Sequence, residues 1–272
     1  MDTQEEKKYL KMLHLNPYAI KNIPHPTEEM KLLAVRENGL LLQYIGDPTP
    51  EIQAAAIENT PKAIRFLADP SPEIVTAVIK KGWNNLEYIK NPSPALIRLA
   101  LQESGWAIRY VPNPSVDLQL LAVQKNYDAI KFIKDPAPEV QEAAVKSNYE
   151  ALRYIENPTR EARCSGVKEN ERALPLLREV TKEDVIEYLK LNILSVKYLP
   201  PSIVLSDEEW EAILTDVLSD ENVEEKYVRN FINCRAFDRD GDVYPMNKLQ
   251  FIYDRGSKKA KRITVDEKLS FK

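Results

Sequence analysis

The sequence predicts an all-α repeat protein, an α-α solenoid of short helical hairpins, with a small β hairpin or sheet at its C-terminal end. The chain has 272 residues with 19 prolines and only 7 glycines. Prolines at random positions would break helices, so they must lie at regular boundaries. Their dipeptides do recur 22 residues apart, at Asp47-Pro48, Asp69-Pro70, Asn91-Pro92, Asn113-Pro114, Asp135-Pro136 and Asn157-Pro158.

The repeat from residue 69 to residue 90 shows how each hairpin forms. Ser71 is placed to cap a helix, and Pro72 follows at the first helical position, where its missing N–H costs nothing. Gly82 ends this helix, and most other repeats have Asn there. Both residues tolerate the left-handed conformation that closes many helices, so we expect it at this position. A second, shorter helix then precedes the next proline turn.

Two columns of the repeat are aliphatic in every copy, which predicts one continuous core made by stacking. The first helix supplies Leu13, Val35, Ile57, Ile79, Leu101, Val123, Val145, Val167 and Leu189. The second supplies Ile20, Leu42, Ile64, Leu86, Ile108, Ile130, Leu152, Leu174 and Val196. Nine repeats therefore make a predicted solenoid domain over residues 3–200. A further Tyr/Phe column in the second helix is also assigned to core packing, with the hydroxyls at the edge.

Segments such as DPSPEIVTAVIKKG and NPSPALIRLALQES resemble the short α-solenoid repeats of the variant leucine-rich and HEAT-like families. They resemble still more the repeats of about this length, with N-G-x-A-I-x-Y-I-like second helices, of phage-encoded helical-repeat proteins of unknown function. The resemblance covers roughly residues 3–200. It implies a binding scaffold, and a few HEAT-like proteins bind nucleic acid.

Two further segments follow the repeats. Residues 201–235 predict a helical cap, and between residues 207 and 225 this cap has nine acids and no Lys or Arg. Residues 236–272 predict a small basic β segment, because KLQFIYDRG and KRITVDEKLSF alternate and contain β-prone residues. The turn between these strands is either a solvated hairpin tip or a contact for phosphate or an acidic partner, through Arg255, Lys258, Lys259, Lys261 and Arg262.

Catalytic signals are sparse, so we predict no catalytic residue, no metal, no cofactor and no enzyme. His14 and His25 are the only histidines, and neither has a partner at metal-ligand spacing. His14 is expected on an exposed helix face. Cys164 is expected at the edge of the core, where it would not be a nucleophile. The acids of residues 238–242 could bind Ca²⁺, but the positions of an EF-hand glycine and final acid hold Val243 and Leu249, so a polar turn is favoured.

Two surface features are candidates for binding a partner. A basic column in the second helices includes Arg65, Arg109, Lys131 and Arg153, together with Lys21 and Lys197. It forms either an anion-binding ladder or a set of charges paired with acids of neighbouring repeats. Aromatic residues at four successive hairpin turns are either interface anchors or local packing. These are Trp83, Trp106, Tyr127 and Tyr149.

The predicted function is a non-catalytic protein-binding scaffold or adaptor. The resemblance adds a phage or prophage origin and a host or viral protein as partner, which the chain would bind or inhibit. Nucleic-acid binding through the basic ladder and the 255–262 turn is the alternative, and the net charge of −4 makes it second. Two cysteines, no signal peptide and no long apolar stretch predict a cytoplasmic protein without membrane contact.

Overall fold

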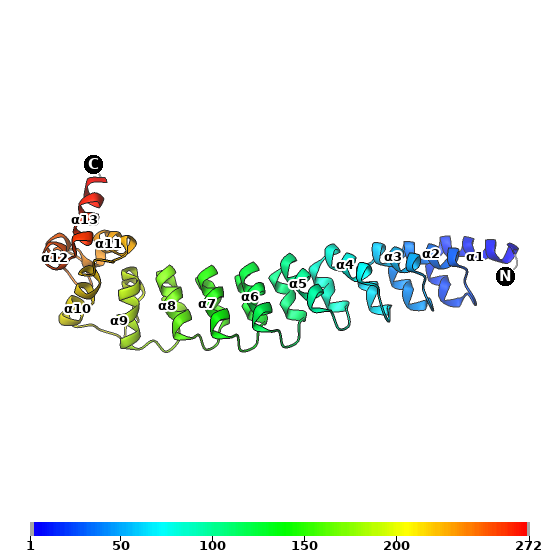
Figure 1. Cartoon of the computed structure of the whole chain (residues 1–272), viewed down its shortest axis with the longest axis horizontal. Coiled ribbons are helices and arrows are strands. Elements are labelled where there is room, and N and C mark those ends of the chain that lie inside the picture. The colour runs from blue at the N-terminus through cyan, green and yellow to red at the C-terminus, as the bar shows by residue number, and fades with distance from the viewer. Residues whose placement is uncertain (1–2, 271–272) are drawn as a thin grey trace. The chain divides into compact units, whose positions relative to one another are not determined.

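The computed structural model describes residues 3–270, and its regular elements are all helices (Figure 1). Each predicted repeat is one α-helix followed by one short 3-10 helix, so the all-α repeat is confirmed. The chain divides into two compact units, an N-terminal unit of residues 1–132 and a C-terminal unit of residues 133–272. None of the helices within residues 3–270 has the length and apolar content that crossing a bilayer requires.

The N-terminal unit contains six helix pairs. They are α1 (Thr3–Leu15) and η1 (Pro17–Asn22), α2 (Glu28–Glu37) and η2 (Gly39–Tyr44), α3 (Pro50–Asn59) and η3 (Pro61–Phe66), α4 (Pro72–Lys81) and η4 (Trp83–Tyr88), α5 (Pro94–Glu103) and η5 (Gly105–Tyr110), and α6 (Val116–Lys125) and η6 (Tyr127–Phe132).

The C-terminal unit contains three further pairs and then a group of helices that is not repetitive. The pairs are α7 (Pro138–Ser147) and η7 (Tyr149–Tyr154), α8 (Arg160–Glu169) and η8 (Glu171–Leu176), and α9 (Lys182–Leu191) and η9 (Ile193–Tyr198). The last group is α10 (Asp207–Leu218), α11 (Glu225–Asn233), η10 (Arg235–Phe237), α12 (Lys248–Arg255) and α13 (Lys258–Ser270). Its core, which includes Trp210, Phe231 and Phe237, is continuous with the buried residues of α9 and η9.

The two aliphatic columns that sequence periodicity assigned to the core are buried. Both aliphatic columns lie inside along their whole length, from Leu13 and Ile20 in the first repeat to Leu189 and Val196 in the last. Ser71 caps α4 as predicted, because its Oγ accepts a hydrogen bond from the Ile74 N–H at 3.4 Å. The stacking of small hairpins is therefore carried by the same positions in both units.

The prediction of a left-handed residue at each helix end is wrong in its location. Asn38 has an extended backbone with φ −151°, and its side chain caps the following 3-10 helix by accepting from the Leu40 N–H at 3.0 Å. Gly82 is extended as well, with φ 170°. The left-handed residues instead occupy the column that begins each repeat, and five of them precede a proline, namely His25, Asp47, Asn91, Asn113 and Asp135, whereas Glu179 precedes Val180. Asn and Asp tolerate this conformation best among side-chain-bearing residues, which explains their frequency there.

The predicted β hairpin of residues 236–272 is also wrong, because this part forms α12 and α13. Asn247 caps α12 by accepting from the Gln250 N–H at 3.3 Å. In α13 the buried residues are Ala260, Ile263, Thr264 and Glu267, which follow the helical spacing i, i+3, i+4, i+7. Several residues that favour strands do have buried apolar side chains in this segment. Their packing on the helical core, and not their strand preference, determines that they are helical.

Candidate functional site

The candidate aromatic and basic-ladder residues lie on the 3-10 helices. The geometry of a 3-10 helix determines which of them share an exposed side. A 3-10 helix has three residues per turn, so positions i and i+3 lie on the same side. Trp106 and Arg109 share one exposed side of η5, and Trp106 is 38% exposed. Trp83 and Tyr127 each open their helix, three residues before a buried aliphatic residue, and are half-buried. The basic column therefore faces solvent, as its place beside the buried column predicts.

Three aromatic rings meet where η4 and η5 lie next to each other. The rings of Trp83 and Trp106 are 6.3 Å apart between centroids and meet edge to face at 69°. The ring of Tyr110 lies 6.4 Å from that of Trp83. Such edge contacts stabilise aromatic groups beyond the area that they bury. The two tryptophans that the sequence placed at successive turns are thus in direct contact.

Cations cover the exposed sides of these rings. The Arg109 guanidinium lies 5.3 Å from the centroid of Tyr110 and 5.0 Å from that of Phe132. The Lys131 ammonium lies 5.4 Å from the Trp106 ring and 5.1 Å from Phe132. All of these distances are within the range of cation–π attraction. We call Trp83, Trp106, Arg109, Tyr110, Asp128, Lys131 and Phe132 the aromatic–cation cluster.

Asp128 connects two members of the cluster, Trp106 and Lys131. The sequence does not predict Asp128 as a site residue. Its carboxylate accepts from the Trp106 indole Nε1 at 2.7 Å and from Lys131 Nζ at 2.7 Å. Partial burial would raise the pKa of Asp128, but the hydrogen bonds from Lys131 and Trp106 leave that pKa below its ordinary value. The one available signal was its place three residues before Lys131, on the same side of η6.

The Tyr/Phe column packs on the core at Phe66 and Tyr88, as predicted, but it is less buried than the two aliphatic columns. Phe66, Tyr88, Tyr110 and Phe132 are only half-buried, and Tyr44 is exposed. A cation can contact the part of each ring that the core does not cover. One repeat before the cluster, Arg65 lies 4.9 Å from the Phe66 ring and 6.0 Å from the Tyr88 ring. The column is therefore a platform for the basic ladder.

The residues of the basic ladder differ in whether they form ion pairs. Lys131 pairs with Asp128 of its own repeat, Arg153 lies 3.8 Å from Glu150, and Lys197 lies 3.9 Å from Glu171 of the preceding repeat. Among the ion pairs of the described residues, none includes Arg65 or Arg109. These two guanidinium groups stack on aromatic rings and keep donors directed to solvent.

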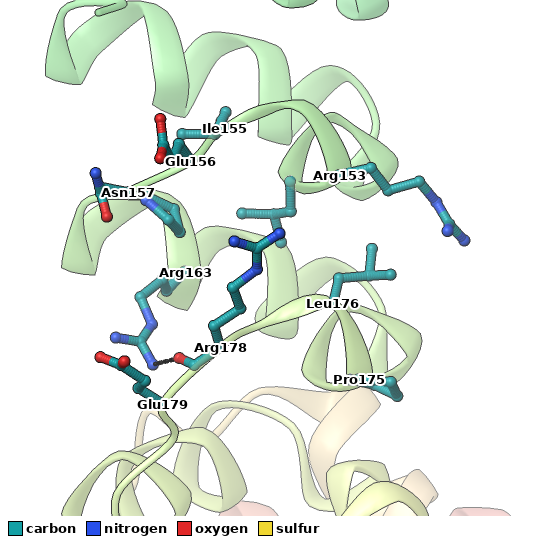
Figure 2. A pocket seen from close by; sticks show the side chains of 11 residues that line it. Arg153, Ile155, Glu156, Asn157, Arg163, Pro175, Leu176, Arg178 and Glu179 are labelled. Atoms are coloured by element: carbon teal, nitrogen blue, oxygen red, sulfur yellow. Dashed lines mark hydrogen bonds between the residues drawn. The ribbon is translucent and has the colours of Figure 1, made fainter.

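The C-terminal unit carries the remaining ladder and turn residues. Tyr149 is half-buried at the start of η7, and Arg153 is exposed. Arg153 also borders a hollow of about 560 Å³ but points away from it, whereas Arg178 extends into its middle (Figure 2). Arg163, on the same hollow, lies 3.3 Å from Asp184 and donates to the Arg178 carbonyl oxygen at 3.4 Å (Figure 2). The lining also includes Glu156 and Glu179, so the hollow has charges of both signs and they indicate no ligand class.

The basic residues of the predicted hairpin tip are dispersed over the end of α12 and the start of α13. Arg255 pairs with Glu211 at 2.8 Å, and Lys261 lies 5.7 Å from the Tyr253 ring. Lys258 and Arg262 are exposed, and Lys259 is half-buried. Since these residues belong to a helix in place of a loop, they do not converge on one point.

The residues considered for chemistry have structural surroundings. His14 is exposed, as predicted. Burial, followed by the nearby Glu187, raises the pKa of the half-buried Cys164 thiol to about 11, so at neutral pH it is protonated and weakly nucleophilic. Asp238 forms an ion pair with Lys248 at 2.7 Å. Within the described residues, no group of three or more His, Cys, Asp or Glu side chains is arranged to hold a metal ion.

Comparison of this chain with protein-family models, with curated proteins and with solved structures found no match. The resemblance to HEAT-like and phage repeats therefore rests on the quoted repeat residues alone.

Proposed function

We propose that this chain is a non-catalytic protein-binding scaffold and that the aromatic–cation cluster is its principal contact surface. The observation that carries this proposal is the exposed, preorganised Trp106. Its indole is held by the hydrogen bond to Asp128 and by the edge-to-face contact with Trp83. Fixing a large side chain before binding removes an entropic cost of association.

The composition of the cluster supports a protein partner. Trp, Tyr and Arg are the residues that most often dominate the energy of protein interfaces. The cluster holds all three within contact distance, on 3-10 helices that the stacked core makes rigid. Tyr127 lies beside it on η6, and Tyr149 and Arg153 are the corresponding candidates of the C-terminal unit. A partner from a phage-infected host is the identity that the repeat resemblance suggests.

The test is affinity capture from the native host, with identification of the retained proteins by mass spectrometry. Wild type and a Trp83→Ala/Trp106→Ala variant serve as parallel baits. We expect the partner to bind the variant more weakly by more than about 2 kcal/mol, the loss typical of an anchor residue. That value is then measured by titration of the purified partner.

Tyr44→Ala is the matched control, because Tyr44 is an exposed aromatic residue on η2, outside the cluster. It should bind the partner as wild type does. Circular dichroism of all three proteins establishes that they are folded. A folded double variant with unchanged affinity would refute the cluster as the contact surface.

Nucleic-acid binding is the second candidate, and the stacking of Arg65 and Arg109 on aromatic rings favours it specifically. Alternating cations and aromatic platforms also bind single strands, through phosphates and bases respectively. This candidate predicts binding of short single strands or duplexes that weakens steeply between low and high salt. Absence of any binding at low salt excludes it, and loss of binding in an Arg65→Gln/Arg109→Gln variant would establish it.

A further inference from the structure

Helices α12 and α13 leave an apolar groove between them on the side away from the core. The groove has a volume of about 510 Å³. Four large apolar side chains line it and are well exposed, namely Leu249 at 48%, Tyr253 at 71%, Val265 at 56% and Leu269 at 61%. Exposed apolar residues gathered in this way mark an interaction site more often than scattered ones do.

Each helix has a second apolar stripe that folding does not use. On α12, Ile252 is buried in the core, while Leu249 and Tyr253 are spaced i, i+4 and face the groove. On α13, Ala260 and Ile263 are buried, while Val265 and Leu269 have the same spacing toward the groove. The core residue Ile252 also borders the groove, but the four exposed apolar side chains do not belong to the core, so another reason is needed for their apolar character.

The charges at the groove indicate what it binds. The charged residues that line it are Lys261 and Lys268, seven residues apart on α13 and thus on one side of that helix. Lys261 lies 5.7 Å from the Tyr253 ring, so its charge is held at the edge of the apolar surface. An occupant that satisfies both features is apolar along its centre and acidic along its edge.

We propose that this groove binds an amphipathic α-helix of a partner protein, with apolar residues at i, i+3 or i+4, and i+7, and with carboxylates that pair with Lys261 and Lys268. Two exposed helices with a trough between them form the usual receptor for such a segment. The site lies in the C-terminal unit, separate from the aromatic–cation cluster. A chain with both sites would be an adaptor with one surface for each of two partners.

Two other occupants fit the groove less well. In a symmetric pair of chains, two grooves whose charged lining residues are all lysines would face each other. An anionic membrane would meet the acidic helix α10, which packs beside α12 and carries Asp207 and Glu208. Glu211 of the same helix is paired to Arg255 at the end of α12.

The experiment is selection from a displayed library of helix-prone 16-residue peptides with randomised faces, using the full chain as bait. We expect enrichment of peptides with an apolar stripe flanked by Glu or Asp, and a Kd on the order of 10 µM for the best of them, since the groove is short. Tyr253→Ala/Leu269→Ala should weaken these peptides at least tenfold. A Lys261→Glu/Lys268→Glu variant should select peptides with Lys or Arg at the flanks.

Val204→Ala is the matched control, because Val204 is 77% exposed in the same unit but outside the groove. It should leave peptide affinity unchanged. Failure to enrich helical peptides, or equal affinity for wild type and the Tyr253→Ala/Leu269→Ala variant, would overturn the proposal. So would flotation of the wild type with phosphatidylserine vesicles, or dimerisation that the groove variant abolishes. The Trp83→Ala/Trp106→Ala variant should retain the peptides, which separates this test from that of the proposed function.

Discussion

At the scale of single residues, Asp47 and Asp69 occupy the same place in successive repeats but differ in backbone conformation. Asp47 is left-handed, with φ 44°, whereas Asp69 is not among the residues with positive φ in the described part of the chain. Both precede a proline and both are exposed. The same residue type at the same column therefore meets two different steric demands.

We predict that Asp47→Val destabilises the protein by about 1–2 kcal/mol, because a β-branched side chain in the left-handed region contacts its own backbone. The free energy of unfolding in urea measures this. Asp69→Val is the control and should cost clearly less, since valine before proline accepts an extended backbone. Equal losses for the two variants would show that the left-handed conformation is not responsible.

The candidate site residues could be singled out from the sequence at this scale, but the residues that they contact could not. Trp83 and Trp106 stood out because they depart from the repeat pattern. That Asp128 bonds Trp106 depends on the distance between η5 and η6, which no column of the sequence records. The half-exposure of the Tyr/Phe column also depends on how closely neighbouring elements pack, which the sequence columns do not record.

At the scale of elements, the close approach of η5 to α6 depends on the glycine that opens η5. Gly105 opens η5, and a Cβ added there would lie 2.1 Å from the Ala122 carbonyl oxygen and 3.2 Å from the Asn126 nitrogen. Its own N–H donates to the Asn126 side chain at 2.8 Å. Glycine is required there for close contact between repeats.

Gly105→Ala should therefore destabilise the protein by about 1–3 kcal/mol, the usual cost of overpacking. Gly46→Ala provides the comparison, because a Cβ at Gly46 would have nothing within 4 Å. Thermal unfolding should have a lower midpoint temperature in Gly105→Ala than in wild type. The midpoint of Gly46→Ala should stay close to that of wild type. Similar midpoints would mean that η5 can move away from α6 at little cost.

At the scale of the whole molecule, the last repeat depends on the helices that follow it. Val185, Leu189 and Ile193 of α9 and η9 share a core with Trp210 and Phe231. The Tyr227 hydroxyl, buried in α11, donates to the Leu189 carbonyl at 3.1 Å. Terminal repeats need such a covering to keep their apolar faces from water.

A chain shortened to residues 1–200 should lose protection in its last repeat. Hydrogen exchange followed by mass spectrometry is expected to show faster exchange over α9 and η9, because their apolar face is uncovered. The amides of α2 and α3 serve as an internal control and should exchange as in the full chain, since each repeat contacts only its neighbours. Unchanged exchange in α9 would mean that the repeats end without a cap.

The sequence by itself determined the repeat, its helical character and the buried columns, because the same local pattern must bury the same positions in every copy. Tertiary structure alone decided three other features. It made helices of α12 and α13, since their apolar residues pack on a helical core and do not pair as strands. It brought Asp128 to Trp106, and it left the groove of Leu249, Tyr253, Val265 and Leu269 uncovered. These features depend on distances between elements, which a periodic sequence does not encode column by column.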